Sequence, residues 1–236
     1  MSNFVAFMLS ALLLVPAFLI AIPVHEMGHA LTAYFMGDRS VRYFGYLKPD
    51  PRRFLDPLGV IAVFVALVGW GKRVPIQPNR VSGAGRRVIY ELGGPAANLL
   101  VAVALGLVLR VLLNGGMVLS LSFSTGLIGE AIFVIVFLNL SIFAFQLLPF
   151  PGLDGWGVVE ALFRSRNPRF FYNVDSRRQQ VWIGAIIAIF IFQLLWGTSL
   201  LALVMIPFYW PASLISLGQC AGYGIRGFNL LAPCPP

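Results

Sequence analysis

Long apolar runs constrain what this chain can fold into. There are five of them, at residues 4–35, 58–71, 88–113, 127–148 and 181–217. Of the 236 residues, 58% are hydrophobic and only 11% are charged. A soluble domain of this length cannot bury so much apolar surface, so the surrounding medium must be lipid. The sequence therefore predicts an α-helical polytopic membrane protein.

The lengths of the runs predict how often the chain crosses the bilayer. A transmembrane helix needs about 20 apolar residues, so runs 4–35, 88–113 and 127–148 each predict one crossing. Run 58–71 is too short and is flanked by basic loops, which predicts a re-entrant element. Run 181–217 is too long for one crossing and contains Gly197, Pro207 and Pro211, which predicts one crossing and a broken element. We expect about four to six transmembrane helices and one short re-entrant element.

The first run begins without basic residues and has no small-residue cleavage site. We therefore expect a helix that is retained rather than a signal peptide.

The basic residues are gathered in three loops. Of the 17 Lys and Arg, five lie in each of residues 38–56, 72–87 and 164–178. Basic residues in short loops between apolar runs follow the positive-inside rule, so we expect these loops in the cytoplasm. This distribution explains the net charge of +8 without nucleic acid, which is not an expected partner.

The only histidines, His25 and His29, lie in the cytoplasmic half of the first run. Side chains four residues apart share one face of a helix, so both imidazoles can reach one metal ion. Glu26 completes the pattern H-E-x-x-H, in which the glutamate is the general base rather than a ligand. Helix packing is the alternative role for these residues. A carboxylate within a bilayer costs about 3 kcal/mol, however, and this cost favours a functional role.

A catalytic zinc ion keeps three protein ligands and one open position, so a third ligand must come from a carboxylate or a cysteine. Asp154 in "LLPFPGLDG" lies on the same predicted side as the histidines, among prolines and glycines that restrict the backbone. Asp56 in "RRFLDPLG" is also on that side and precedes an apolar run. The residues alone favour Asp154 and leave Asp56 open.

Three segments carry a resemblance to a known family. "HEMGHA", "GGPAANLL" and "LLPFPGLDG" follow one another in the order and approximate spacing of the site-2 protease family of intramembrane zinc metalloproteases. The resemblance covers residues 22–160. The stretch "LDPLG…GWGKRVPIQPNR" is similar to the compact branch of that family, without PDZ or CBS domains.

The resemblance implies a ligand set and a base. His25, His29 and Asp154 would bind one zinc ion per chain, and Glu26 would be the catalytic base. This places Asp154 well above Asp56 as the third ligand.

Two amide side chains have roles that follow from the resemblance. The family has an asparagine eight residues before the zinc-binding aspartate, where this chain has Gln146. That asparagine helps to hold the substrate or the developing oxyanion, and Gln146 offers the same amide on a longer stem. Asn98 in "GGPAANLL" has two open interpretations: a hydrogen bond that packs helices together, or support of the metal site from a neighbouring helix.

The resemblance implies a metalloendopeptidase that cuts in or near the transmembrane segment of a membrane-protein substrate, with its site toward the cytoplasm. The alternative is a catalytically weak or inactive zinc-binding homologue that acts as a membrane scaffold or assembly subunit. Gln146 favours that alternative and Glu26 opposes it. A zinc transporter would need more acidic or histidine residues on several helices.

The predicted organisation is simple. We expect one membrane-embedded domain over residues 1–236, with a catalytic core at about 4–163 and C-terminal membrane segments at about 181–217.

Overall fold

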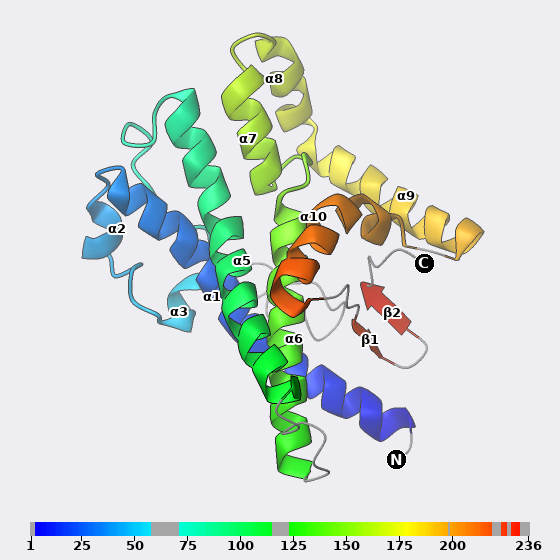
Figure 1. Ribbon diagram of the computed structural model, residues 1–236. Helices are drawn as coiled ribbons and strands as arrows, with labels where there is room; N and C mark the ends of the chain where they lie inside the picture. The colour runs from blue at the N-terminus through cyan, green and yellow to red at the C-terminus, as the bar shows by residue number, and fades with distance from the viewer. Residues whose placement is uncertain are drawn as a thin grey trace.

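The computed structural model describes residues 3–57, 71–114, 123–197, 199–218, 223–225 and 228–231. Within these ranges the chain forms a helical bundle with one small two-stranded antiparallel sheet (Figure 1). The elements are α1 (Asn3–Phe35), α2 (Ser40–Tyr43), α3 (Pro51–Phe54), α5 (Ala84–Asn114), α6 (Phe123–Gln146), α7 (Asp154–Phe163), α8 (Pro168–Ser176), α9 (Arg178–Trp196), α10 (Leu200–Leu217), β1 (Tyr223–Ile225) and β2 (Phe228–Leu231). The predicted re-entrant element falls on residues 58–70, which lie outside the described residues.

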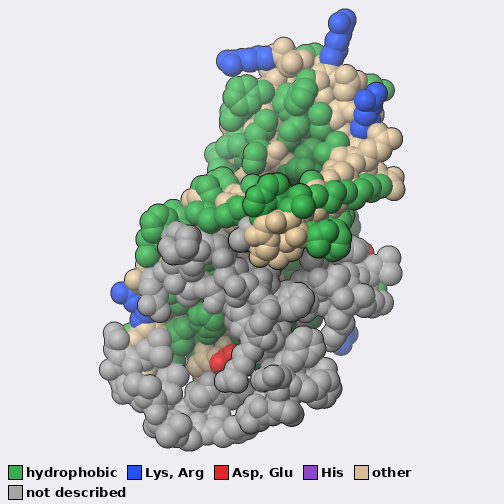
Figure 2. Space-filling view, turned by 90° about the vertical axis from the view of Figure 1, so that its right-hand side faces the viewer, with side chains coloured by type: hydrophobic (Ala, Val, Ile, Leu, Met, Phe, Trp, Pro, Cys, Tyr) green, Lys and Arg blue, Asp and Glu red, His purple; other side chains and the backbone are tan. Residues whose placement is uncertain are grey.

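In the described part of the chain, five helices are long and apolar enough to span a membrane. Their spans are Leu12–Phe35, Ala84–Leu112, Ile128–Gln146, Arg178–Trp196 and Leu200–Leu217. Hydrophobic side chains predominate on the described part of the face in Figure 2, and Lys and Arg stand at its upper end and margins. The prediction of a polytopic helical membrane protein with four to six transmembrane helices is confirmed.

The last apolar run is divided, as predicted, but the division falls at one place only. α9 ends where Gly197 adopts a left-handed conformation with φ 69°, which glycine reaches without a steric penalty. Pro207 and Pro211, expected to break the second element, lie inside α10. Membrane helices tolerate proline where neighbouring groups satisfy the carbonyls that it frees.

α5 is the central helix of the bundle and packs against α1, α6, α7 and α10. It approaches α1 most closely where two glycines meet. A Cβ added to Gly28 of α1 would lie 2.3 Å from the carbonyl oxygen of Gly93 in α5, so the two backbones are in contact there. Small residues allow this close approach between membrane helices. The crossing brings the His25–His29 face of α1 directly against α5.

α9 differs from the other spans because it has little contact with the bundle. None of the residues of α9 is buried, and in Figure 1 the helix slants away from α5 and α6. Its first turns do reach the α6–α7 connection, where the indole Nε1–H of Trp182 donates to the Pro151 carbonyl oxygen over 2.8 Å. α9 is therefore attached to the loop that precedes Asp154.

Residues 71–77, a short segment without helix, lie over the end of α1. Gly71 pairs with Leu55 in an isolated antiparallel bridge, and the Lys72 N–H donates to the Phe54 carbonyl oxygen over 2.6 Å. Val74 is buried in a small apolar cluster beneath the segment. The cluster consists of Ala30, Ala33, Val41, Phe54, Val74 and Val81.

Asp38, just after α1, holds the other end of the 71–77 segment. Its Oδ2 accepts the Gln77 N–H over 2.7 Å, and its Oδ1 accepts the Ser40 N–H over 3.0 Å. Burial alone would raise the pKa of the Asp38 carboxyl. Hydrogen bonds from the Ser40 hydroxyl and from these two N–H groups outweigh burial and lower that pKa. The segment is thus fixed at both ends.

Candidate metal centre

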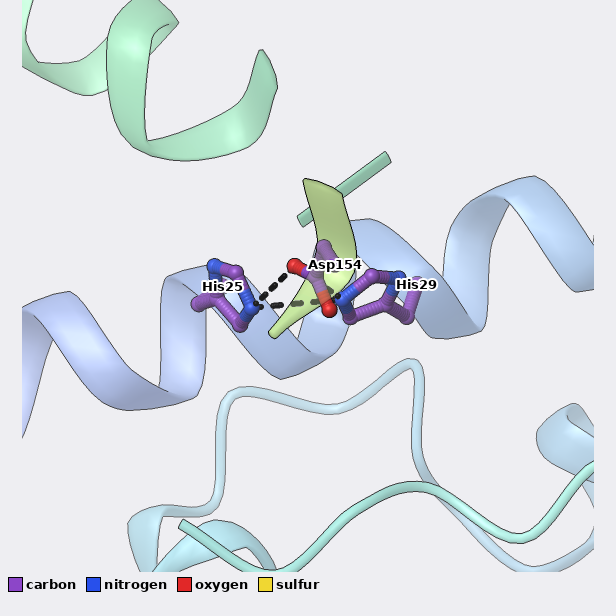
Figure 3. Close-up of side chains that lie close together, drawn as sticks. All are labelled: His25, His29 and Asp154. Atoms are coloured by element: carbon purple, nitrogen blue, oxygen red, sulfur yellow. Dashed lines mark hydrogen bonds and ion pairs between the residues drawn. The ribbon is translucent and has the colours of Figure 1, made fainter. Parts of the chain in front are cut away.

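The two histidines meet as their spacing predicts. On successive turns of α1, His25 and His29 direct their Nε2 atoms toward one another, 3.2 Å apart (Figure 3). The Oδ2 atom of Asp154, at the start of α7, lies 3.0 Å from the first Nε2 and 3.1 Å from the second. All three side chains are buried, and their ligand atoms lie within 4.8 Å of one another. The structure thus brings together two segments that are 125 residues apart.

Partners on the far side of each ring fix how the imidazoles are oriented. The Nδ1 atom of His25 lies 2.8 Å from Asn98 Oδ1, and that of His29 lies 2.8 Å from the Tyr90 carbonyl oxygen. Both partners are acceptors, so each Nδ1 carries the hydrogen. In the neutral rings, each Nε2 then presents its lone pair to the common point.

The Asn98 amide orientation follows from its other contacts. Its Nδ2 donates to the Ala21 carbonyl oxygen over 2.9 Å and to Asn139 Oδ1 over 2.8 Å. This leaves Oδ1 for His25, so the side chain joins α5 to both α1 and α6. Both interpretations of Asn98, helix packing and support of the site, describe this one arrangement.

The donor set fits a zinc ion. Two imidazole lone pairs and a carboxylate oxygen face one point, which is a set of three ligands that zinc sites use. A carboxylate binds a metal in its ionised form, as these imidazoles do in their neutral form.

Gly94 of α5 lies directly against the two rings. A Cβ at this position would be 2.4 Å from His29 Nε2 and 2.6 Å from His25 Cε1. Real Cβ atoms do not approach side chains so closely, so only hydrogen fits there. α5 can therefore pack against the His25 and His29 rings only with a glycine at this position.

Glu26 stays outside the group of converging ligand atoms. Its buried carboxylate accepts the Val74 N–H at Oε2 over 3.2 Å. The 71–77 segment therefore contacts the predicted base through its backbone.

Gln146, at the end of α6, lies close to Asp154 and contacts its backbone. Its Oε1 accepts the Asp154 N–H over 3.4 Å. Asn139, about two turns earlier on α6, does not occupy the position of the family asparagine. It is fully buried, and its amide is engaged by Asn98 and by the Ile135 carbonyl oxygen.

Asp56, the competing carboxylate, is not part of the group formed by His25, His29 and Asp154 among the described residues. Glu91 lies near the site on α5, and its Oε1 is 3.7 Å from Arg87 Nε.

Sequence reasoning missed the Tyr90 carbonyl, the Val74 N–H and the role of Arg73. The Arg73 Nη2 donates to the Gly152 carbonyl oxygen over 3.0 Å and lies 3.8 Å from Asp154 Oδ1. Residues of almost any type can supply a backbone N–H or carbonyl. No sequence signal could therefore have identified the first two partners. The position of Arg73 beside "GWGK" offered only a weak signal.

The chain is similar to curated proteins over about two thirds of its length. The "Putative zinc metalloprotease YwhC" of Bacillus subtilis is 36% identical over 155 residues, which are 63% of this chain and 68% of the relative. Proteins named "Putative zinc metalloprotease Rip2" from Mycobacterium tuberculosis and Mycolicibacterium smegmatis are 32% and 34% identical, over 66% and 63% of this chain. The matched regions are 60% and 56% of those two relatives. No protein-family model and no solved structure matches the chain.

Proposed function

This chain belongs to the site-2 protease family of zinc metalloproteases, and from that premise we propose that it hydrolyses a peptide bond in or near the transmembrane segment of a membrane-protein substrate. The observation that best supports this function is the convergence of His25, His29 and Asp154, with both imidazoles oriented by acceptors behind them. Such outer partners are typical of metal-binding histidines.

His25, His29 and Asp154 would hold one zinc ion per chain. Zinc bound there supplies Lewis-acid chemistry, which activates water as a nucleophile and polarises the scissile carbonyl. Because the protein contributes three ligands, one position stays open for that chemistry.

Glu26 is the general base in this proposal. It takes the proton of the attacking water and delivers it to the leaving amine. The Val74 N–H engages Oε2, which holds the carboxylate in place and leaves Oε1 to carry the proton.

Gln146 is proposed to stabilise the oxyanion. Its Oε1 faces the Asp154 N–H, so its Nε2 hydrogens remain for the carbonyl oxygen of the substrate. Oxyanion donors act where negative charge develops in the transition state.

The proposed orientation places the site toward the cytoplasm in a multi-pass membrane protein. Two of the basic loops meet beside the site: Arg87 Nη2 lies 3.0 Å from Glu160 Oε2, and Arg164 Nη1 lies 2.9 Å from Glu160 Oε1. A shared basic end of the bundle supports the positive-inside assignment. The proposed ligands and base lie in the proposed catalytic core, residues 4–163, within a single membrane-embedded domain.

A substrate helix must unwind before it is cut, because its carbonyls are engaged in helical hydrogen bonds. The 71–77 segment beside Glu26 offers a backbone edge to which an unwound stretch could pair as an added strand. The Lys72 and Val74 N–H groups are directed into the protein, and successive N–H groups of an extended strand point to opposite sides. We propose that the Arg73 N–H, on the other side, pairs with the substrate.

The decisive experiment compares wild-type protein and Glu26→Gln, each reconstituted in liposomes with a single-span membrane protein. The amide of the variant keeps an oxygen for the Val74 N–H but cannot carry the proton. We expect the variant to retain zinc and to lose cleavage, and a chelator to stop the wild type. Cleavage by Glu26→Gln would refute the base assignment. Binding of the substrate without cleavage by the wild type would support the scaffold alternative.

Zinc content measured on purified variants tests the ligand set. His25→Ala and Asp154→Ala should each lose the metal, whereas Asp56→Ala, the matched control on the competing carboxylate, should retain it. Loss of zinc in Asp56→Ala together with its retention in Asp154→Ala would reverse the assignment.

A further inference from the structure

Two successive residues of the 71–77 segment reach the two reactive groups of the proposed site. The backbone of Val74 donates to Glu26, and the guanidinium of Arg73 lies between the Gly152 carbonyl oxygen and the Asp154 carboxylate. The segment is anchored at both ends, by Lys72 on Phe54 and by Asp38 on Gln77, so these contacts come from a fixed support.

The two oxygens of the Asp154 carboxylate have different partners. Oδ2 faces both imidazoles at 3.0 and 3.1 Å, and Oδ1 faces Arg73 Nη2 at 3.8 Å. A carboxylate can bind zinc through one oxygen or through both. If Asp154 used both, its second oxygen would be a fifth ligand that crowds the position where a hydrolytic zinc site binds water.

We propose that Arg73 is a positioning residue that holds Asp154 Oδ1 and thereby keeps this carboxylate a one-oxygen ligand. The inference rests on the proposed zinc site and adds a residue to it. Arg73 also fixes the peptide just before the ligand, because it donates to Gly152 O over 3.0 Å. One side chain therefore restrains both the backbone and the free oxygen of Asp154.

The other arginines nearby do not share this role. A cavity of about 360 Å³ beside the site is lined by Arg73, Arg87, Arg164 and Arg178 together with acidic side chains. Arg87 and Arg164 are paired with Glu160, and of the four arginines that line this cavity only Arg73 forms an ion pair with Asp154 in the described part of the chain.

Arg73 is not needed to hold the fold together. Its side chain is 67% exposed, whereas that of Asp154 is only 4% exposed. A guanidinium this exposed, 3.8 Å from the oxygen it faces, contributes little to stability, so its removal should leave the bundle intact. Its effect should appear in metal coordination instead.

The test uses Arg73→Met, Arg73→Lys and the control Arg178→Met, which changes an arginine of the same cavity that has no ion pair with a described residue. Each full-length protein is loaded with Co²⁺ in place of zinc. Four-coordinate Co²⁺ absorbs visible light more strongly than five-coordinate Co²⁺, so the band intensity reports whether Asp154 uses one oxygen or both.

We expect Arg73→Met to lose band intensity, Arg73→Lys to retain part of it, and Arg178→Met to match the wild type. Cleavage of a reconstituted single-span protein by zinc-loaded Arg73→Met should fall in kcat by about 10- to 100-fold, the usual effect of losing an outer partner, with KM little changed. Thermal unfolding should be unchanged.

The outcomes separate this inference from the proposed function. If the wild type binds cobalt and cleaves, but Arg73→Met shows the same spectrum and kcat, Arg73 has no positioning role and the protease assignment stands. If the wild type binds neither cobalt nor zinc, the proposed function and this inference both fail.

Discussion

The Nδ1 atom of His25 lies 2.8 Å from the Oδ1 atom of Asn98, so a single hydrogen bond ties the first metal-ligand candidate of α1 to α5. The same amide donates to Ala21 in α1 and to Asn139 in α6. Every hydrogen-bonding atom of the Asn98 side chain is engaged and the residue is fully buried. The orientation of the His25 ring is therefore set by three helices at once.

Replacement of Asn98 should weaken zinc binding without removing a ligand. In Asn98→Ala the His25 ring loses its acceptor, and we expect the zinc dissociation constant to rise by about 10- to 100-fold. Asn98→Asp keeps an oxygen for the His25 Nδ1–H and should recover part of the loss. Competition with a chromophoric chelator measures both values. Asn173→Ala, at an exposed position of α8, is the control. Equal affinity in Asn98→Ala and wild type would show that the hydrogen bond does not orient the ligand.

A methyl group at Gly94 should abolish metal binding by steric conflict. Its Cβ would lie 2.4 Å from His29 Nε2, so α1 and α5 must separate or the rings must turn. Gly85→Ala, on the same helix with nothing within 4 Å, is the matched control. Alanine in a helix is favoured over glycine by about 1 kcal/mol, so the control should be at least as stable as the wild type. Zinc content of the two purified variants decides the matter, and full occupancy in Gly94→Ala would contradict the packing argument.

The convergence of His25, His29 and Asp154 was predictable because each residue's position depends on a regular feature of the chain. Helical periodicity places His25 and His29 on one face, and the alternation of apolar runs with basic loops places Asp154 at the same end of the bundle. The family resemblance then chose between Asp154 and Asp56. Their meeting in space required only that the helices cross the membrane in the predicted order.

The partners that complete the site were not predictable. His29 bonds a carbonyl 61 residues away, and Glu26 is contacted by a backbone N–H 48 residues away. Any residue type supplies a backbone amide, so the sequence carries no mark of these contacts. The division of the last run was harder for a related reason. Gly197, Pro207 and Pro211 each predicted a break in this run. Of these three, only Gly197, which adopts a left-handed conformation, ends a helix.

Gln146→Leu should separate catalysis from metal binding. The variant loses the amide proposed for the oxyanion, whereas His25, His29 and Asp154 keep their contacts. We expect zinc content to be retained and kcat to fall by about 10²- to 10³-fold, the usual cost of one oxyanion donor. Gln146→Asn, which restores the family residue, should keep or increase kcat. Single-turnover cleavage of a reconstituted substrate gives these rates. An unchanged kcat in Gln146→Leu would leave Gln146 with only its hydrogen bond to the Asp154 backbone.

Acid should release the 71–77 segment by protonating Asp38. The folded state lowers the pKa of this carboxyl through hydrogen bonds from Ser40 and Gln77, whereas an unfolded chain has the ordinary value of about 3.9. Because the folded-state pKa is depressed, the stabilisation is complete above that ordinary value and is lost as pH falls through the lower folded-state pKa. Hydrogen-exchange protection of the Gln77 N–H, corrected for intrinsic rates, should fall over that acid range.

Asp38→Asn supplies the comparison for this acid response. A hydrogen bond to a charged acceptor contributes about 1.5–3 kcal/mol and a neutral one about 1 kcal/mol, so protection of the Gln77 N–H at pH 7 should drop by about tenfold in the variant. Its acid dependence should also disappear, because the titrating group is gone. Asp175→Asn, which changes a carboxylate paired with Arg164 far along the chain, should leave the response of Gln77 as in the wild type. Acid-dependent protection that persists in Asp38→Asn would assign the response to another carboxyl. It would also show that Asp38 does not hold the 71–77 segment in place.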